Sequence, residues 1–330
     1  MSLKKINELA TKLGSVNIME VCGGHTNSII RNGIRDAMPK NINLISGPGC
    51  PVCVTTQKEI DEMINLALNG VPVATYADMI RVPGTKMSLE EARENGADIK
   101  AVYSATEVLD DKNRVFFGIG FETTTPMTAK LLENDIAVYS AHKLIPPGLL
   151  ALSTDKRVNI DALILPGHVA VIIGEQEFPD LNVPQVITGF EPENILESIK
   201  IILDQLVEGK KEIVNNYKGV VTKTGNGKAQ KIINENFKVV DSDWRGLGTI
   251  PSSGLEPKDD NLNAKIKYKD ILGKTITKEL PGCRCAEVII GQIRPSECQL
   301  FGKVCTPKNP RGACMVSEEG ACQIYHANRN

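Results

Sequence analysis

Short apolar runs rich in Val and Ile alternate with helical patterns along about the first 215 residues. The runs that predict strands cover residues 17–21, 42–45, 71–75, 101–103, 115–119, 136–139, 162–165 and 185–187. Residues 57–68 place apolar side chains on one stripe, which predicts an amphipathic helix. Ser88 and Glu91 have the spacing of a capping box at the start of another helix. This alternation favours βαβ units, and therefore an α/β fold in which parallel sheets form twice over.

The same patterns divide the chain into four expected parts. Residues 1–16 predict an N-terminal helix, residues 17–112 and 113–217 two α/β domains, and residues 218–330 a cysteine-rich domain. Lys218 to Lys238 is polar and contains glycine, which is typical of a linker, here with one strand. Turn-forming residues dominate beyond Gly246. We therefore expect the last part to be smaller and richer in loops.

Composition narrows the classes of function. The formal net charge is −2, which is not typical of a nucleic-acid-binding protein. The chain begins with a polar segment, and no apolar run approaches the length of a membrane span, so we expect a cytoplasmic protein. A chain of 330 residues does not need disulfides to replace a core. In a reducing compartment, its nine cysteines are more typical of metal ligands or redox groups.

Polar motifs follow four of the expected strands directly. They are Cys22-Gly-Gly-His25, Gly47-Pro-Gly-Cys50-Pro-Val-Cys53, Gly120-Phe-Glu122 and Pro166-Gly-His168. Ligands of open parallel sheets bind at the carboxyl ends of the strands, where helix amino termini offer their N–H groups. We therefore expect these four motifs to face one cleft.

The residue types in these motifs leave several chemistries open. Cys22 is suited to bind a soft metal or to act as a nucleophile, and a buried apolar role is the alternative. Cys50 and Cys53 form a Cys-x-x-Cys motif that spans one metal or closes a disulfide. Glu122 caps a helix or donates a proton in the cleft, and His168 lies in a turn where a functional imidazole is accessible.

Six further cysteines crowd the C-terminal end among glycines and prolines. They are Cys283, Cys285, Cys298, Cys305, Cys314 and Cys322. Structural zinc sites usually draw on paired Cys-x2-Cys knuckles, whereas these spacings are irregular and two thiols are surplus to a four-ligand site. The pattern favours an iron–sulfur cluster with an accompanying dithiol over zinc.

Together, these motifs resemble those of the HypD family of [NiFe]-hydrogenase maturation proteins. The resemblance extends to Gly246-Leu-Gly-Thr-Ile-Pro-Ser-Ser-Gly254 and to the tail that ends at Cys322, and so covers nearly the whole chain. It implies two similar Rossmann-like α/β domains around a central cleft and a smaller C-terminal domain with a [4Fe–4S] cluster. It also implies a complex with HypC, on which an iron ion acquires one CO and two cyanide ligands.

The resemblance also implies roles for individual residues. Cys283, Cys298, Cys305 and Cys322 would bind the cluster, with Cys285 and Cys314 as a nearby redox pair. Cys22 would hold the iron, His25 would lie beside it, and Cys50 and Cys53 would be further iron ligands or a dithiol relay. Glu122 and His168 would complete the catalytic set.

The implied partners are other maturation proteins. HypE would supply cyanide that derives from carbamoyl phosphate through HypF, and the completed unit would pass to the precursor of the hydrogenase large subunit. Two alternatives explain part of the chain: a cluster-dependent thiol/disulfide oxidoreductase, and a zinc-stabilised binding protein.

Overall fold

The computed structural model describes residues 2–329 and contains two parallel sheets and a two-stranded antiparallel hairpin. Sheet A has the order β2-β1-β7-β8-β9, and its strands are β1 (Val16–Glu20), β2 (Ile42–Ser46), β7 (Ala162–Pro166), β8 (Gln185–Thr188) and β9 (Ile213–Asn215). Sheet B has the order β4-β3-β5-β6, and its strands are β3 (Val73–Tyr76), β4 (Ile99–Val102), β5 (Val115–Gly118) and β6 (Val138–Ser140). The hairpin joins β10 (Phe237–Trp244) to β11 (Gly248–Pro257). The expected α/β class with two parallel sheets is confirmed.

Helices connect the strands of both sheets. The α-helices are α1 (Ser2–Ala10), α2 (Gly23–Arg31), α3 (Pro51–Val54), α4 (Gln57–Leu68), α5 (Ala77–Ile80), α6 (Leu89–Glu94), α7 (Thr125–Leu132), α8 (Ile145–Thr154), α9 (Gly167–Ile173), α10 (Pro192–Glu208), α11 (Gly227–Asn236), α12 (Ala264–Lys267), α13 (Lys269–Leu272), α14 (Cys285–Ile289) and α15 (Ala321–Ala327). Four 3₁₀ turns are η1 (Ala105–Val108), η2 (Glu175–Glu177), η3 (Pro295–Glu297) and η4 (Ala313–Met315).

Local sequence explains where several helices begin and end. The capping box of Ser88 and Glu91 is present at α6, and Thr56 with Glu59 forms a second one at α4. The longest helix, α10, has a proline at its first position and ends at Gly209, whose φ of 70° is left-handed. The predicted strands and the amphipathic helix at residues 57–68 are confirmed to within a few residues.

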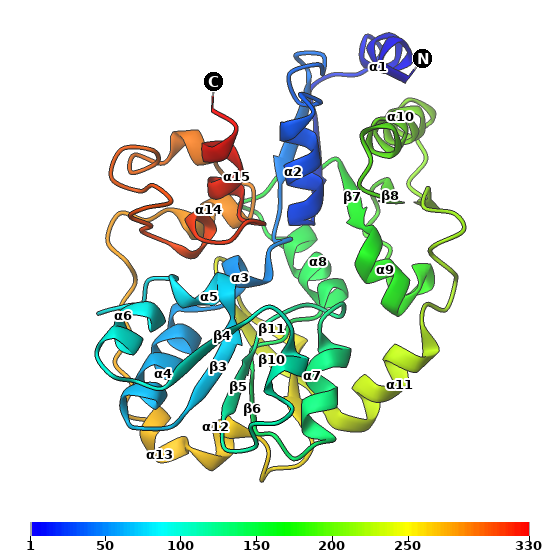
Figure 1. Cartoon of the computed structure of the whole chain (residues 1–330). Coiled ribbons are helices and arrows are strands. Elements are labelled where there is room, and N and C mark those ends of the chain that lie inside the picture. Colours follow the sequence, from blue (N-terminus) through cyan, green and yellow to red (C-terminus); the bar gives the residue numbers. More distant parts are fainter. Residues whose placement is uncertain (1, 330) are drawn as a thin grey trace.

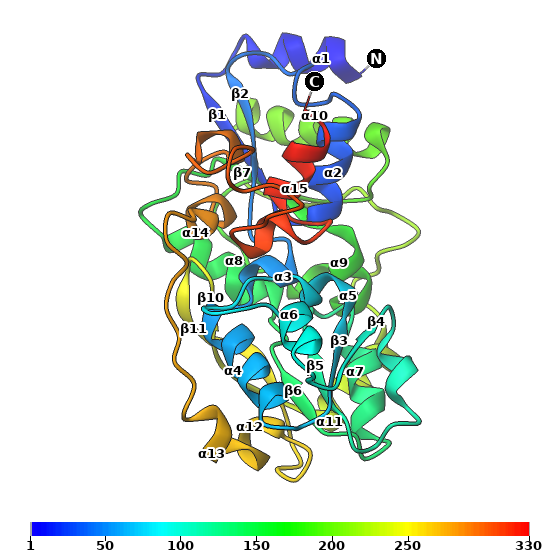
Figure 2. The same ribbon diagram turned by 60° about the vertical axis from the view of Figure 1, so that its left-hand side comes forward.

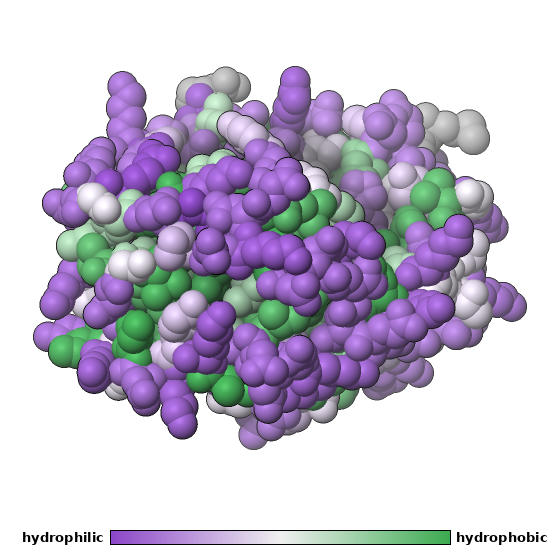
Figure 3. Space-filling model, turned by 60° about the horizontal axis from the view of Figure 1, so that its bottom comes forward, coloured by the Kyte–Doolittle hydropathy of each residue, from purple (hydrophilic) through white to green (hydrophobic). Residues whose placement is uncertain are grey.

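The two sheets lie at opposite ends of the molecule. Sheet A, covered by α1 and α10, occupies one end, sheet B occupies the other, and α3 and α8 lie between them (Figures 1 and 2). All residues of β5, β7 and β8 are buried, as expected for parallel strands that are covered on both faces. The end beyond sheet B shows a largely hydrophilic surface with smaller hydrophobic areas (Figure 3). Within residues 2–329, no helix has the length and apolarity needed to cross a bilayer.

The sheets do not follow the expected domain boundary at residues 112 and 113. That boundary falls between β4 and β5, which both belong to sheet B, and sheet A combines β1 and β2 with the later strands β7, β8 and β9. Local patterns predict strands but carry no information about which sheet a strand joins, because strand pairing is a long-range contact. The expected linker at 218–238 is partly wrong, since α11 forms 10 of its residues, with Asn226 as N-cap.

Candidate functional site

Cys22 lies directly after β1 and is the N-cap residue of α2. Its backbone N–H donates to Glu20 Oε2 at 3.2 Å. Burial raises the pKa of the Cys22 thiol to about 12, and the nearby Glu319 carboxylate adds to this effect. The side chain is therefore a protonated thiol at neutral pH and a poor nucleophile. A bound cation is the kind of partner that would favour its thiolate.

Two histidines contact one aromatic ring beside Cys22. The His25 ring stacks on Phe190 with 4.6 Å between the ring centroids, and the His168 ring lies tilted against Phe190 with 4.2 Å between the centroids. His25 Nε2 hydrogen-bonds to Gly189 O at 3.1 Å, whereas its buried Nδ1 has no partner among the described residues. Burial lowers the pKa of His25 to about 4, so its ring is neutral at pH 7.

Sequence reasoning missed Phe190, although a signal for it exists. Gly189 and Phe190 follow β8 directly, just as the recognised motifs follow β1, β2, β5 and β7. An aromatic residue is usually assigned to the core, which is why this position does not attract attention in the sequence. In the structure it holds His25 and the exposed His168 in one stack.

Cys50 and Cys53 lie at the start of α3, directly after β2 and the Gly47-Pro-Gly49 turn. They form a disulfide with a Cα–Cα distance of 5.2 Å, and both side chains are buried. Gly49 brings this turn against Cys22: its carbonyl accepts from Gly23 N at 3.3 Å, and a Cβ at Gly49 would overlap the backbone of Cys22. The two thiol motifs are therefore in direct backbone contact.

Arg245, which follows the hairpin strand β10, ties the Cys50–Cys53 turn to the C-terminal cysteines. Its Nε donates to Cys53 O and to Thr55 O, each at 3.1 Å, and its buried Nη2 has no partner among residues 2–329. Its positive charge acts on the Cys285 thiol. Sequence reasoning did not single out this arginine, because the contact joins positions 192 residues apart.

All six C-terminal cysteines line one small cavity. Its wall also includes Arg284, Val288, Leu300, Phe301, Arg311, Gly312 and Met315. The turns predicted around these cysteines let thiols from positions 283 to 322 converge. The cavity abuts α3, because α14 and η4 both pack on that helix.

Neighbouring thiols in this cavity shift one another's pKa values. Cys285 interacts with Cys283 and with Cys314. Hydrogen bonds from Cys283 and Cys314 lower the pKa of Cys285, while the same bonds raise the pKa of Cys283 and of Cys314.

The donor set of the cavity fits an iron–sulfur cluster. Clusters of the [4Fe–4S] type are held by four cysteine thiolates, one on each iron, so their ligands surround a cage. In residues 2–329, no group of three or more His, Cys, Asp or Glu side chains is placed to hold a single metal ion. Six thiols around one cavity supply four such ligands and leave two over.

Glu122 follows a strand of the other sheet, so the four motifs do not all lie at the edge of one sheet. Glu122 follows β5 of sheet B, whereas the Cys22, Cys50 and His168 motifs follow strands of sheet A. Its Oε1 accepts from Ile145 N at 2.9 Å, so it caps α8 and not the helix that it precedes. Its Oε2 is buried with no partner among the described residues, and burial raises the pKa of Glu122 to about 7.

Comparison with known proteins identifies the family. The family model described as "HypD: Hydrogenase formation hypA family" matches residues 1–329. The chain belongs to the HypD family. It is 42% identical over 350 aligned residues to a protein of Methanocaldococcus jannaschii named for hydrogenase expression and formation, with 99% of this chain and 96% of that protein covered.

Two bacterial relatives carry the name hydrogenase maturation factor HypD. The protein of Rhizobium leguminosarum bv. viciae is 38% identical, with 98% of this chain and 91% of that protein covered. The protein of Rhodobacter capsulatus is 39% identical, with 98% of this chain and 93% of that protein covered. The match to the HypD family therefore spans both sheets, the hairpin and the cysteine cavity.

Proposed function

We propose that this HypD protein is the scaffold on which the Fe(CN)2CO unit of [NiFe]-hydrogenase is assembled, in complex with HypC. One observation carries the proposal: the three groups of thiols lie on segments that contact one another in turn. The Cys22 loop touches the Cys50–Cys53 turn through Gly49, and α3, which follows Cys50, packs on α14 and η4, which carry Cys285 and Cys314.

In this proposal, the iron under assembly is cargo held by Cys22 together with a cysteine of HypC. Low-spin ferrous iron with cyanide and CO ligands accepts soft thiolate donors. The raised pKa of Cys22 supports a role as metal ligand over a role as free nucleophile, because the thiol needs a cation to lose its proton at neutral pH. The neutral His25 beside it keeps positive charge away from the site. HypE acts as cyanide donor, and the precursor of the hydrogenase large subunit receives the product.

Cys283, Cys298, Cys305 and Cys322 would hold a [4Fe–4S] cluster, which supplies electrons one at a time when bound. Cys285 and Cys314 line the same cavity, and the elements that carry them, α14 and η4, pack on α3, which suits a dithiol that exchanges with the Cys50–Cys53 pair. The low pKa of Cys285 favours its thiolate, the form that attacks a disulfide.

The test of the iron site is an infrared spectrum of the complex with HypC, prepared with HypE and HypF in the absence of oxygen. We expect bands in the cyanide and CO stretching region that vanish in Cys22→Ala while the visible absorbance of the cluster remains. Unchanged bands in Cys22→Ala would refute the assignment of this thiol.

The test of the cluster site is the variant Cys298→Ala. We expect it to lose the visible absorbance of the cluster together with bound iron and sulfide, because one of four ligands is removed. Cys22→Ala is the matched control, since it removes a thiol outside the cavity. Equal iron and sulfide contents in both variants would contradict the ligand set.

The second candidate function, a free-standing thiol/disulfide oxidoreductase, finds support in the Cys50–Cys53 disulfide. Its burial argues against direct exchange with a protein substrate, since the two cysteines are only 5% and 2% exposed. Turnover of a protein disulfide by the isolated, cluster-loaded chain would favour this second function.

A further inference from the structure

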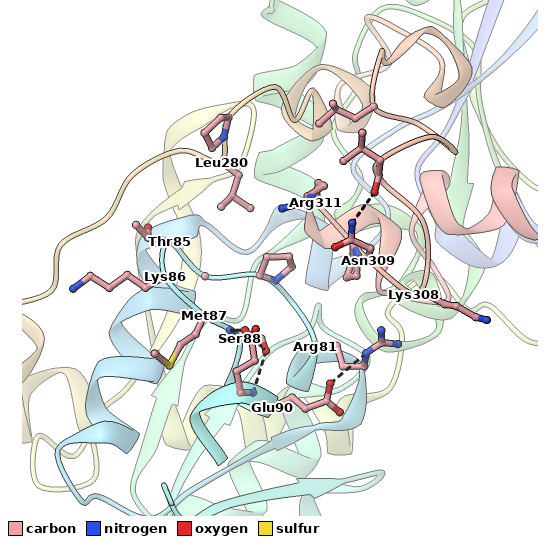
Figure 4. A pocket seen from close by; sticks show the side chains of 17 residues that line it. Arg81, Thr85, Lys86, Met87, Ser88, Glu90, Leu280, Lys308, Asn309 and Arg311 are labelled. Atoms are coloured by element: carbon pink, nitrogen blue, oxygen red, sulfur yellow. Dashed lines mark hydrogen bonds and ion pairs between the residues drawn. The ribbon is translucent and has the colours of Figure 1, made fainter. Parts of the chain in front are cut away.

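A cavity of about 560 Å³ lies between the loop before α6 and the turns that carry the C-terminal cysteines (Figure 4). Two contacts hold its walls together. Arg81 Nη2 donates to Pro307 O at 2.9 Å, and Lys278 N donates to Thr85 Oγ1 at 2.9 Å. The cavity is therefore formed by segments that are tied to each other across about 200 residues of sequence.

The walls combine an apolar surface with positive charge. The apolar lining includes Met87, Leu280, Leu300 and Val304, of which Val304 is 46% exposed. The charged lining consists of Arg81, Lys86, Lys308 and Arg311 against Glu90 and Glu91. Glu90 pairs with Arg81 at 3.4 Å, and Glu91 caps α6, which leaves Lys86, Lys308 and Arg311 as the cations outside that pair. Four cations against two carboxylates make the cavity positive on a chain whose formal net charge is −2.

This cavity adjoins the cysteine cavity directly. Leu300 and Arg311 line both of them. The backbone N–H of Arg311 donates to Cys305 Sγ at 3.3 Å. A single layer of residues therefore separates the external cavity from the thiols that would hold the cluster.

The directions of the charged side chains favour a macromolecular partner. Arg311 reaches toward the middle of the cavity, whereas Lys86 and Lys308 extend outward from opposite ends (Figure 4). Cations that converge would suit a small anion, but cations that spread around an apolar centre match a protein interface with a polar rim.

We propose that this cavity is the docking site of an acidic one-electron carrier protein, a role that rests on the function proposed above. The reduced carrier would give up one electron to the cluster that the neighbouring thiols would hold, and no bond or proton would be transferred. Opposite charge increases the association rate of such transient complexes and makes it sensitive to salt.

The experiment uses the cluster-loaded chain alone and an acidic [2Fe–2S] ferredoxin as probe. It compares the wild type with Lys86→Glu/Lys308→Glu. The control is Lys12→Glu/Lys40→Glu, which changes two exposed lysines outside the cavity and alters the net charge equally. Two quantities are measured at low and high salt: the dissociation constant of the oxidised carrier, and the rate at which the reduced carrier reduces the cluster.

We expect the cavity variant to bind at least tenfold more weakly and to be reduced at least tenfold more slowly at low salt, with the difference shrinking at high salt. The control should match the wild type, and all three proteins should react equally with dithionite. Equal effects in both variants, or no binding of the ferredoxin to the wild type, would overturn the docking site. Failure to load any cluster would instead refute the proposed function, so the two failures are distinguishable.

Discussion

Replacing Gly49 by alanine tests the contact between the two thiol motifs of sheet A. The added Cβ would meet Cys22 N, Cys22 Cα and Val21 C, all of them backbone atoms, well inside van der Waals contact. The φ of Gly49 is not left-handed, so the cost arises from overlap and not from backbone strain.

The magnitude follows from the distance that the two turns must move. Carbon atoms pack best at about 3.5–4.0 Å, so relief of the overlap requires a shift on the order of 1 Å. Overpacking of this kind costs about 1–3 kcal/mol. A loss of about 2 kcal/mol in the free energy of unfolding lowers the unfolding temperature of a domain of 150–250 residues by roughly 4–8 °C, and we expect a fall of this size for Gly49→Ala.

The same shift should move Cys22 away from the Cys50–Cys53 turn. Misplacement by about 1 Å costs on the order of 10²-fold in a reaction that depends on geometry. We therefore expect the cyanide and CO bands of the complex to be lost even at temperatures where the variant is folded. Alkylation of Cys22 should become faster, since the thiol is partly buried by the turn.

Gly14→Ala is the matched control, because a Cβ at Gly14 meets nothing within 4 Å. It should unfold within about 1 °C of the wild type, with unchanged alkylation of Cys22. If Gly49→Ala unfolds at the wild-type temperature and Cys22 reacts at the wild-type rate, the argument from backbone contact is refuted.

Three further predictions concern burial. The pKa of Glu122 is about 7 in the folded chain and 4.5 in the unfolded chain. Below pH 4.5 the carboxyl group is protonated in both states, so its ionisation does not change the free energy of unfolding. Between pH 4.5 and pH 7 only the unfolded chain loses the proton readily, so the free energy of unfolding falls as the pH rises. Glu122→Gln should therefore be more stable than the wild type by up to about 3 kcal/mol at pH 8 and equal to it at pH 4, which urea unfolding at both values would measure. Arg245→Met removes two hydrogen bonds to backbone carbonyls and should cost about 3 kcal/mol in urea unfolding, whereas the exposed Arg31→Met should cost under about 1 kcal/mol. Phe190→Ala admits water to the His25 imidazole, so the pKa of His25 should rise from about 4 toward 6.5. An NMR titration measures this pKa, and an unchanged pKa would contradict the idea that the Phe190 ring shields His25 from water.

Local features of the chain were readable without the structure. The strands, the amphipathic helix at 57–68 and the capping box at Ser88 depend on side-chain periodicity and on neighbours within four residues, which the sequence contains. The position of Cys22, Cys50 and His168 at one edge of sheet A was also predictable, because residues that follow parallel strands lie at the sheet edge. The α/β class and the HypD family resemblance follow from the same motifs.

Tertiary structure alone decided which of these pieces meet. The assignment of β1 and β2 to the sheet of β7 to β9, the cap that Glu122 provides for α8, and the bonds from Arg245 to the Cys50–Cys53 turn all join distant positions. Periodicity reports only that a face is apolar, not which other apolar face covers it. The sequence determined the elements and the reactive groups, and long-range packing determined that the three segments with thiols contact one another and that a positive cavity lies beside the last of them.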